Sequence, residues 1–279
     1  MKLGFVTCVA LGKSCMDAIY EVGGELSLVI TLKDSQAVNK SGRVYLDEFC
    51  RDRDVPLHKS SHINNDDCIE AIKAHSIDWL FIIGWSQIAN MELLNSPSRG
   101  VLGMHPTLLP VGRGRAAIPW AILKGVEKTG VTLFKLDEGV DTGPVLGQKE
   151  IGLDENSDAS WLYQEVDNAH IALMKDLIPK IMNDQIELLV QDESQASIWE
   201  GRKPEDGLIN LNGSAFEANR LVRAVTHPYP GAFLIRDGKK VIVWKSRIHG
   251  LKDVNIGTHI KFKDGLLEII EYQEIDTNN

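Results

Sequence analysis

Two stretches of the chain combine a histidine and an aspartate in a way that suits proton transfer. Residues 103–110 read GMHPTLLP and place His105 after an apolar run, and residues 136–143 read LDEGVDTG and place Asp141 between two glycines. An imidazole held near a carboxylate can carry protons during acyl transfer. We therefore predict that His105 and Asp141 are catalytic. A glycine-flanked aspartate is also a common turn former, and Asp137 is an alternative in the same loop.

The elements around this pair must hold it at one edge of a sheet. Apolar, β-branched runs predict strands, and apolar residues at helical spacing predict helices. The expected strands are 2–9, 26–31, 79–83, 100–104, 131–135 and 143–150. The expected helices are 14–22, 44–53, 66–75, one that begins within 119–123, and 159–183. This alternation predicts an α/β fold with a Rossmann-like, mostly parallel sheet and helices on both faces.

A polar, irregular stretch at 192–207 predicts a boundary within the chain, because glycine and proline interrupt regular elements. We expect a catalytic domain at 1–191, a linker at 192–207 and a small β-rich, open-barrel-like domain at 208–279. The expected elements of this second domain are a helix at 214–224 and short strands at 233–235, 241–244, 259–262 and 266–271.

Composition and charge argue against several classes of function. The chain has 279 residues and a net charge of −9, whereas a broad nucleic-acid footprint normally needs a basic face. No apolar run approaches the ~20 residues that a bilayer span needs, and the first ten residues read as a strand rather than a signal peptide. The four cysteines lack metal-ligand spacing. We expect a cytoplasmic protein with no membrane partner, no disulfide and no metal.

Two loops offer groups that bind anions. Gly12 and Lys13 lie near the start of the first predicted helix, where backbone N–H groups can hold a phosphate, although the glycine spacing is not that of a Walker loop. Arg113 and Arg115 follow Pro110, and arginines beside an active site suit a phosphate or a carboxylate. A solvated loop is the alternative. We predict Gly12, Lys13 and Arg113 as substrate-binding residues.

Taken together, these motifs resemble the folate-dependent formyltransferases. The central motif of that family is usually written Asn-x-His-Pro-Ser-Leu-Leu-Pro and is followed by Asp-x-Gly-x-Asp-Thr-Gly. Similar segments cover nearly the whole chain: FVTCVALGKSCMDAI at 5–19, WAILKG at 120–125, GRKPEDGLI at 201–209 and HPYPGAF at 227–233. The tail resembles the C-terminal domain of methionyl-tRNA formyltransferase and of sugar-nucleotide formyltransferases, including the UDP-4-amino-4-deoxy-arabinose type.

The resemblance implies 10-formyltetrahydrofolate as donor, a primary amine as acceptor and no metal. It implies that His105 steadies the tetrahedral oxyanion and helps to move the amine proton, and that Asp141 orients His105. It also implies that the strand end at 81–88 lines the pterin pocket, which fits a flat heterocycle. The donor-binding residues expected on this basis are Ile83, Trp85, Ile88, Gly139 and Val140.

One residue of the family motif is missing, because Gly103 stands where the family has asparagine. The asparagine side chain donates to the formyl oxygen, and glycine has no side chain to do so. Three explanations stay open. A nearby side chain such as Gln87 or Ser86 substitutes, backbone amides supply the donor, or the chain is a slow enzyme or a folate-binding relic. We predict Gln87 as a third catalytic residue.

Three functions follow from the resemblance. The first is N-formylation of an amino sugar on UDP or dTDP, as in lipopolysaccharide biosynthesis, and the acidic charge favours it. The second is methionyl-tRNA formylation, in which phosphate contacts would dominate affinity, and a net charge of −9 suits that partner poorly. The third is a non-catalytic folate-binding protein. The resemblance also makes a homodimer a candidate assembly.

Overall fold

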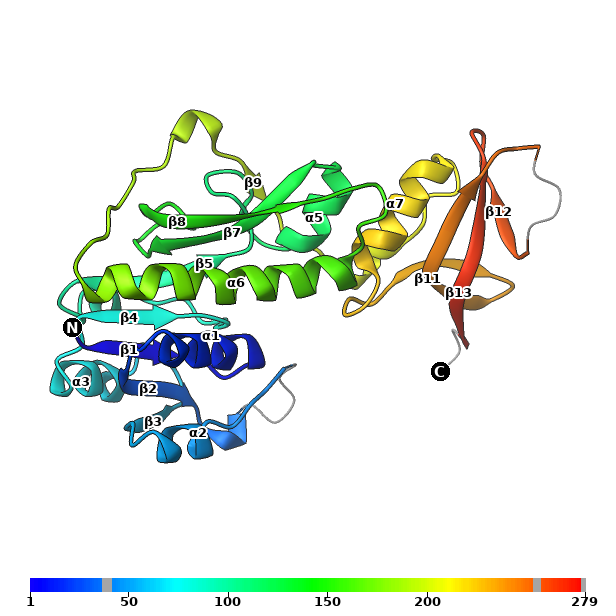
Figure 1. Ribbon diagram of the computed structural model, residues 1–279. Helices are drawn as coiled ribbons and strands as arrows, with labels where there is room; N and C mark the ends of the chain where they lie inside the picture. The colour runs from blue at the N-terminus through cyan, green and yellow to red at the C-terminus, as the bar shows by residue number, and fades with distance from the viewer. Residues whose placement is uncertain (37–41, 253–256, 277–279) are drawn as a thin grey trace. The chain divides into compact units, whose positions relative to one another are not determined.

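The computed structural model describes residues 1–36, 42–252 and 257–276. Its main sheet has seven strands in the order β3-β2-β1-β4-β5-β7-β8 (Figure 1). Strands β3, β2, β1, β4 and β5 run parallel, and β7 is antiparallel to β5. The bounds are β1 Leu3–Val6, β2 Leu26–Leu32, β3 Leu57–Ser60, β4 Trp79–Ile82, β5 Gly100–His105, β7 Lys128–Lys135 and β8 Val145–Gly152. The predicted mostly parallel, Rossmann-like sheet is confirmed.

Helices cover this sheet on both faces. On one face, α3 (Asp66–Ala74) packs in a buried cluster that includes Val6, Leu28 and Leu80, which belong to three adjacent strands. Figure 1 shows α1 (Ala10–Glu21) and α6 (Ala159–Met182) passing over the other face. Two-sided burial explains why the central strands read as continuous apolar runs rather than as alternating ones. The short helices α2 (Asp47–Asp52) and α4 (Met91–Leu94) lie in the connections.

The strand order reverses between β1 and β4, which are hydrogen-bonded neighbours. Open α/β sheets bind ligands at such a reversal, in the crevice beyond the carboxyl ends of the strands. Here those ends lead into Thr7–Val9 and Ile83–Trp85, and β5 ends nearby in the same sheet at His105. The fold therefore brings the segments that the sequence singled out to one edge of one sheet.

The C-terminal residues form a four-stranded antiparallel sheet in the order β10-β11-β13-β12. Its strands are β10 Ala232–Arg236, β11 Lys239–His249, β12 His259–Lys261 and β13 Leu266–Asp276. Helix α7 (Ala215–Val225) begins at a capping box in which Ser214 and Glu217 satisfy each other's backbone N–H groups. The predicted β-rich fold of the tail is confirmed as a curled antiparallel sheet with one helix.

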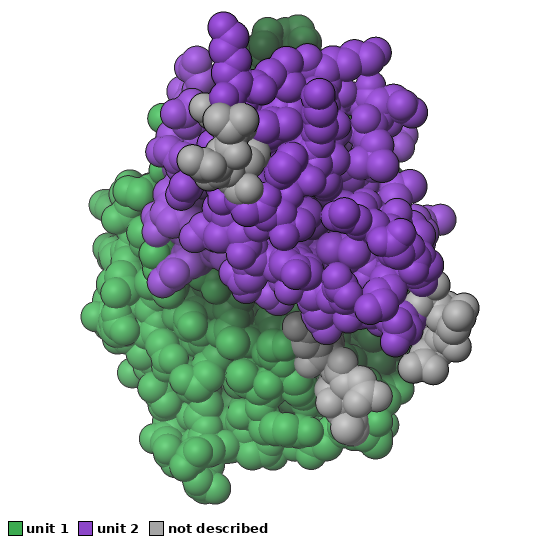
Figure 2. All heavy atoms as spheres, turned by 90° about the vertical axis from the view of Figure 1, so that its right-hand side faces the viewer, with its two compact units in different colours: residues 1–113, 130–150, 166–198 green, residues 114–129, 151–165, 199–279 purple. Residues whose placement is uncertain are grey.

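The chain divides into two compact units, which Figure 2 colours separately. Unit 1 comprises residues 1–113, 130–150 and 166–198, and unit 2 comprises residues 114–129, 151–165 and 199–279. Helix α5 (Ala117–Lys124) thus belongs with the tail, although it lies in the middle of the sequence. The division at 1–191, 192–207 and 208–279 stays a prediction. None of the described helices is long and apolar enough to span a membrane.

The stretch predicted as a linker carries short elements. These are the 3-10 turns η2 (Glu193–Gln195) and η3 (Pro204–Gly207), and β9 (Ile198–Trp199), which pairs with β6 (Arg113–Gly114). The first helix differs from its prediction, because it starts at Ala10 rather than at Ser14. Gly12 and Lys13 therefore lie in the first turn of α1 instead of in a loop before it.

Candidate active site

His105 is the last residue of β5, and its side chain is nearly buried. The Nε2–H group of its ring donates to the backbone oxygen of Gly112 at 2.8 Å. A neutral imidazole carries one N–H, so this contact fixes which nitrogen holds it and leaves Nδ1 as an acceptor. The ring is thus oriented by the loop that immediately follows the strand.

Asp141 lies in the loop between β7 and β8, in a left-handed backbone conformation with φ of 55°. Hydrogen bonds within the loop stabilise it, because Asp137 Oδ1 accepts from the backbone N–H of Gly139 and from the hydroxyl of Thr142. A side chain at Gly143 would meet the backbone oxygen of Lys135 at 1.7 Å, so only glycine fits there. The sequence around Asp141 therefore specifies a tight loop that presents one carboxylate.

The structure brings His105 and Asp141 together, with 3.4 Å between Nδ1 and Oδ2. Both partners of the ring, the Asp141 carboxylate and the Gly112 oxygen, are acceptors. A neutral ring can donate to only one of them, whereas a ring that has gained a proton can donate to both. The pair can therefore accept a proton at Nδ1 and stabilise it with the adjacent carboxylate, which is the work of a general base.

The loop that follows His105 is pinned by two polar side chains from neighbouring strands. The hydroxyl of Thr132, which pairs with His105 across β5 and β7, donates to Thr107 O at 2.7 Å and accepts from Leu109 N–H at 3.0 Å. The amide of Gln148 donates to Leu109 O at 2.7 Å and to the Thr132 hydroxyl at 2.9 Å. These contacts fix the path of the chain toward Gly112.

A second buried histidine lies on α6. The Nδ1–H group of His170 donates to Val166 O at 2.7 Å, and burial lowers the pKa of His170 to about 4, with the charge of His105 as a lesser cause. Its ring is therefore neutral at ordinary pH, and we assign it no proton-transfer role. Sequence reasoning did not single out His170, because its position within the apolar pattern of α6 reads as core.

Comparison with known families agrees with this geometry. A model described as "Formyl transferase" matches residues 15–178, more than half of the chain, and one described as "Formyl transferase, C-terminal domain" matches residues 202–275. This chain belongs to the formyl transferase family. Both units of the formyltransferase contain residues matched by these models, and formyl transfer is its class of activity.

Solved structures of the same fold cover nearly the whole formyltransferase chain. WlaRD, a sugar 3N-formyl transferase solved in the presence of dTDP and 5-N-formyl-THF, is 21% identical with a TM-score of 0.70, and the match covers 100% of this chain and 98% of that one. The N-formyltransferase from Helicobacter canadensis, solved with folinic acid and dTDP-3-aminofucose, is 18% identical with a TM-score of 0.69. This match covers 96% of this chain and 99% of that one. Methionyl-tRNA formyltransferase from Clostridium thermocellum is 17% identical, with a TM-score of 0.64 over 99% and 99%.

The side chain of Leu136 occupies the space beside Gly103, where the family has asparagine. A Cβ atom at Gly103 would lie 2.7 Å from Cδ2 of Leu136, a side chain that packs against the core of the sheet. The space that a larger residue at 103 would need is therefore taken by Leu136. In this formyltransferase, a side-chain donor at position 103 is absent and its space is filled with hydrocarbon.

Gln87, predicted to replace that donor, has both of its amide atoms in use elsewhere. Its oxygen accepts from Ile63 N–H at 2.8 Å, and its nitrogen donates to Ser61 O at 3.1 Å. The structure thus brings Gln87 to the loop after β3 rather than to His105. The donor role of Gln87 stays a prediction, and it would require the amide to leave this loop.

The residues predicted to line the donor pocket differ in exposure. Ile83 is buried and Trp85 is partly buried against the sheet core. By contrast, Ile88 is 87% exposed and Val140 is 67% exposed, and Gly139 stands beside Val140 in the Asp141 loop. Apolar side chains this exposed are what an apolar ligand could cover, and their donor-binding role stays a prediction.

The predicted substrate-binding residues have protein partners. Gly12 packs against Thr7, whose hydroxyl lies 1.9 Å from where a Cβ at 12 would be. Lys13 forms an ion pair with Asp17 at 2.8 Å. Arg113 is 5% exposed and directs its guanidinium to the side chains of Gln191 and Glu193. A phosphate on Arg113 would have to displace these contacts, so the three substrate-binding roles stay predictions.

One group of side chains has the composition of a metal site. Ligand atoms of His58, Asp67 and Cys68 lie within 4.8 Å of one another. Burial raises the pKa of the Cys68 thiol to about 11, which keeps it protonated, and the Ser60 hydroxyl donates to Asp67. In the structure these side chains form a polar contact between β3 and α3, in which His58 Nε2 lies 3.4 Å from Asp67 Oδ2.

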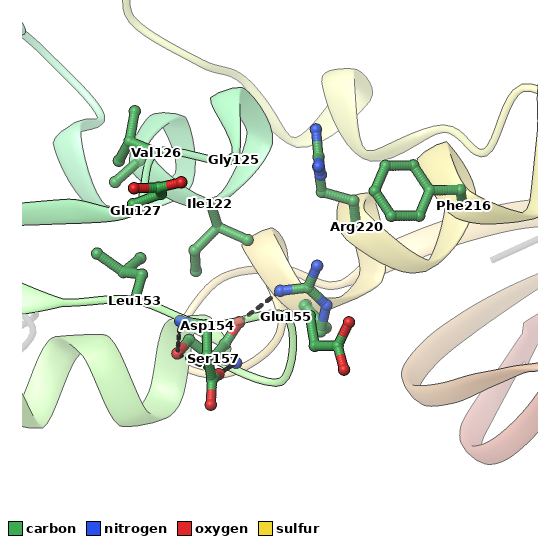
Figure 3. A pocket seen from close by; sticks show the side chains of 12 residues that line it. Ile122, Gly125, Val126, Glu127, Leu153, Asp154, Glu155, Ser157, Phe216 and Arg220 are labelled. Carbon is green, nitrogen blue, oxygen red and sulfur yellow. Dashed lines mark hydrogen bonds between the residues drawn. The ribbon is translucent and has the colours of Figure 1, made fainter.

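A separate cavity of about 270 Å³ lies within unit 2 (Figure 3). Figure 3 shows Arg220 and Phe216 on α7 facing the end of α5 and the segment that holds Asp154 and Ser157. Arg223 Nη1 donates to Ser157 O at 2.6 Å, and the Asp154 carboxylate accepts from Ser157 N–H at 2.7 Å. The lining contains neither His105 nor Asp141, so this cavity is distinct from the candidate catalytic pair.

Proposed function

We propose that this formyltransferase transfers a formyl group from 10-formyltetrahydrofolate to the primary amine of a nucleotide-linked amino sugar. The observation that carries the proposal is the His105–Asp141 pair at the carboxyl edge of the sheet, in a chain whose family is formyl transferase. Membership of the family supports a formyl group as the group transferred. The similar structures solved with formyl-THF or folinic acid support a formyl-folate as the donor.

The reaction is an acyl transfer between two nitrogens. The neutral amine attacks the formyl carbon, and a tetrahedral oxyanion forms. The bond from that carbon to N10 of the folate then breaks, and the proton lost by the amine ends on N10. The products are the N-formyl sugar and tetrahydrofolate, so atoms and charge balance without a metal or an oxidant.

His105 and Asp141 act in both steps of this reaction. Nδ1 of His105 takes the proton that the attacking amine loses, and the Asp141 carboxylate holds the ring charged until the proton passes to N10. General acid–base help of this kind is worth about 10²–10⁴ in rate. The positive charge of the protonated ring also favours the oxyanion electrostatically, while its two N–H groups face Asp141 and Gly112.

The choice of acceptor rests on charge and on similarity. Two of the structures described above carry a dTDP ligand, and both cover this chain almost completely. The net charge of −9 opposes a large polyanion such as tRNA more than it opposes one diphosphate. We therefore favour a UDP- or dTDP-linked amino sugar, bound near the start of α1. The proposed partner is thus a small molecule, and the proposed compartment is the cytoplasm.

A turnover assay tests the proposal. Purified chain is mixed with 10-formyltetrahydrofolate and a panel of UDP- and dTDP-linked amino sugars, with initiator methionyl-tRNA alongside. Release of tetrahydrofolate with one sugar nucleotide supports the proposal and names the acceptor. Formylation of the tRNA alone would overturn the proposal that the acceptor is a sugar nucleotide.

One observation favours a second candidate, a folate-binding protein without turnover. Gly103 lacks the donor side chain, and Leu136 fills its place. The same assay separates the two functions when a binding measurement is added. Binding of 10-formyltetrahydrofolate without turnover on any acceptor would favour this second function.

A further inference from the structure

The segment 191–197, which follows α6, contacts Asp141 and also the loop that orients His105. Within unit 1, the side chain of Gln191 donates through Nε2 to the backbone oxygens of Asp141 at 2.8 Å and Gly143 at 2.7 Å. One of these oxygens belongs to Asp141 itself, and the other lies two residues later in the same loop. The backbone that presents the carboxylate is therefore held by one amide from a distant part of the sequence.

The orientation of that amide is fixed from its other side. Gln191 is 7% exposed, and its Oε1 accepts from Nε and Nη2 of Arg113 at 3.1 and 2.8 Å. Arg113 is anchored in turn by a two-point ion pair with Glu193, which lowers the pKa of the Glu193 carboxyl. A flipped Gln191 amide would set N–H against N–H and oxygen against oxygen, so only one orientation satisfies all four hydrogen bonds.

The same segment also holds the loop that orients His105. The Ser197 hydroxyl accepts from Gly112 N–H at 3.0 Å, and its backbone oxygen accepts from Arg113 N–H at 2.9 Å. Ser197 N–H donates to Pro110 O at 3.2 Å. Gly112 is the residue whose oxygen accepts from the His105 ring. One short segment thus fixes the acceptors on both sides of the imidazole.

We propose that Gln191 is a positioning residue for catalysis: held by Arg113, it sets the Asp141 carboxylate at the distance from His105 that proton transfer requires. The inference rests on the proposed function, because it assigns Gln191 a role in that reaction. It also gives Arg113 a role within the protein rather than on a substrate phosphate. Gln191 acts through Asp141 and does not touch the reacting atoms.

Gln191→Glu tests this role with almost no change in shape. The carboxylate keeps the contact with Arg113 and adds charge to it, but it turns an oxygen toward Asp141 O and Gly143 O and repels both. The matched control is Gln195→Glu, the same substitution on an exposed side chain four residues later. Misplacement of a catalytic group by about 1 Å can cost 10²-fold in rate.

The first readout is kinetic, with the UDP- or dTDP-linked amino sugar that the wild-type chain formylates. We expect kcat of Gln191→Glu to fall about 10²-fold, with KM for 10-formyltetrahydrofolate within twofold of wild type. The pH–rate profile should shift as well, because the Asp141 carboxylate no longer faces Nδ1 at a fixed distance. A kcat within twofold of that of Gln195→Glu would overturn the proposal.

The second readout needs no substrate and separates this inference from the proposed function. Hydrogen–deuterium exchange should rise over residues 137–145 in Gln191→Glu and stay at the wild-type level in Gln195→Glu, while strands β1 and β2 report that the sheet is folded. Unchanged exchange in the loop would overturn the positioning role of Gln191, even if the chain formylates no sugar. If the wild-type chain formylates no sugar but Gln191→Glu still shows faster loop exchange, the failure lies with the proposed function and not with this inference.

Discussion

The ring of His105 has an acceptor at each nitrogen, and this arrangement has a consequence for catalysis. The Gly112 oxygen accepts from Nε2–H, while the Asp141 carboxylate faces Nδ1. If His105 acts as proposed, the proton that it accepts must therefore be held at Nδ1, on the side of Asp141. In the proposed mechanism His105 carries the proton and Asp141 stabilises the charged ring, so substitution of either residue should lower the rate.

We expect His105→Ala to lose about 10²–10⁴ in kcat, because it removes the group that carries the proton. Asp141→Asn keeps the loop but removes the charge that stabilises the protonated ring, and it should also lose most of the turnover. Binding of 10-formyltetrahydrofolate, measured by titration, should survive in both variants. A rate near wild type in either variant would exclude that residue from the chemistry.

Restoring the family asparagine should not by itself raise the rate. In Gly103→Asn, the new side chain meets Leu136 at the position of its Cβ, and one of the two must shift. We expect lower thermal stability and no gain in kcat for the single variant. The double variant Gly103→Asn with Leu136→Ala makes room, and a gain of about tenfold there would show that an oxyanion donor is missing. A large gain in the single variant would contradict this steric argument.

At this scale, the sequence predicted His105 and Asp141 because each stands in a dense motif. It could not predict Gln191, which lies in a polar stretch without a motif and acquires its role only through folding. The same limit applies to Arg113. Its side chain was predicted to face substrate from its place in the chain, whereas its contacts lie with Gln191 and Glu193.

Among the elements, the start of α1 depends on close contact between helix and strand. Because Gly12 has no Cβ, the first turn of α1 can approach Thr7 at the end of β1. A methyl group there would lie 1.9 Å from the Thr7 hydroxyl and 2.4 Å from its Cβ, so the backbone itself must move.

Gly12→Ala should therefore destabilise the protein. Overpacking costs about 3 kcal/mol at the upper end, and the gain in helix propensity returns about 1 kcal/mol, which leaves a net loss of about 2 kcal/mol. Chemical denaturation measures this change. Gly152→Ala is the matched control, because its Cβ would meet no atom within 4 Å and should change stability by under about 0.5 kcal/mol. Equal stability of the two variants would contradict the packing argument.

The sequence predicted apolar elements well and polar ones poorly. Strands β2 and β4 and helix α3 lie within two residues of their predicted bounds, since each has a strong apolar pattern. Strand β3, with the sequence LHKS, was not predicted, because this strand is half-buried at the sheet edge and carries two basic side chains. Its pairing comes from β2 rather than from its own composition.

For the whole molecule, the buried His170 makes stability depend on pH. Burial lowers its pKa from the ordinary 6.5 to about 4 in the folded chain, so between these values the unfolded chain binds the proton more readily. The contribution of a neutral His170 is fully present above pH 6.5 and is lost as the pH falls toward 4, by up to about 3 kcal/mol. His170→Gln should flatten this part of the stability curve, measured by urea unfolding. The exposed His259→Gln should leave it unchanged, and equal slopes in all three chains would contradict the assignment.

The response to salt distinguishes the two kinds of acceptor. A tRNA held by six or more phosphate contacts would lose about 10³-fold in affinity between 50 and 200 mM salt, whereas one diphosphate would lose far less. With a net charge of −9, we expect KM for the acceptor to change only a few-fold over this range. A steep loss would contradict the sugar-nucleotide assignment.

Because Gln191 and Ser197, which hold Asp141 and Gly112, lie far along the chain, the order of synthesis matters. A nascent chain emerges N-terminal end first, so β5 and the Asp141 loop are exposed to solvent before residues 191–197 have been translated. Until Gln191 and Ser197 leave the ribosome, the hydrogen bonds that hold Asp141 and Gly112 cannot form. The nascent protein therefore carries both side chains of the proposed catalytic pair for a time without the hydrogen bonds that we propose to position them.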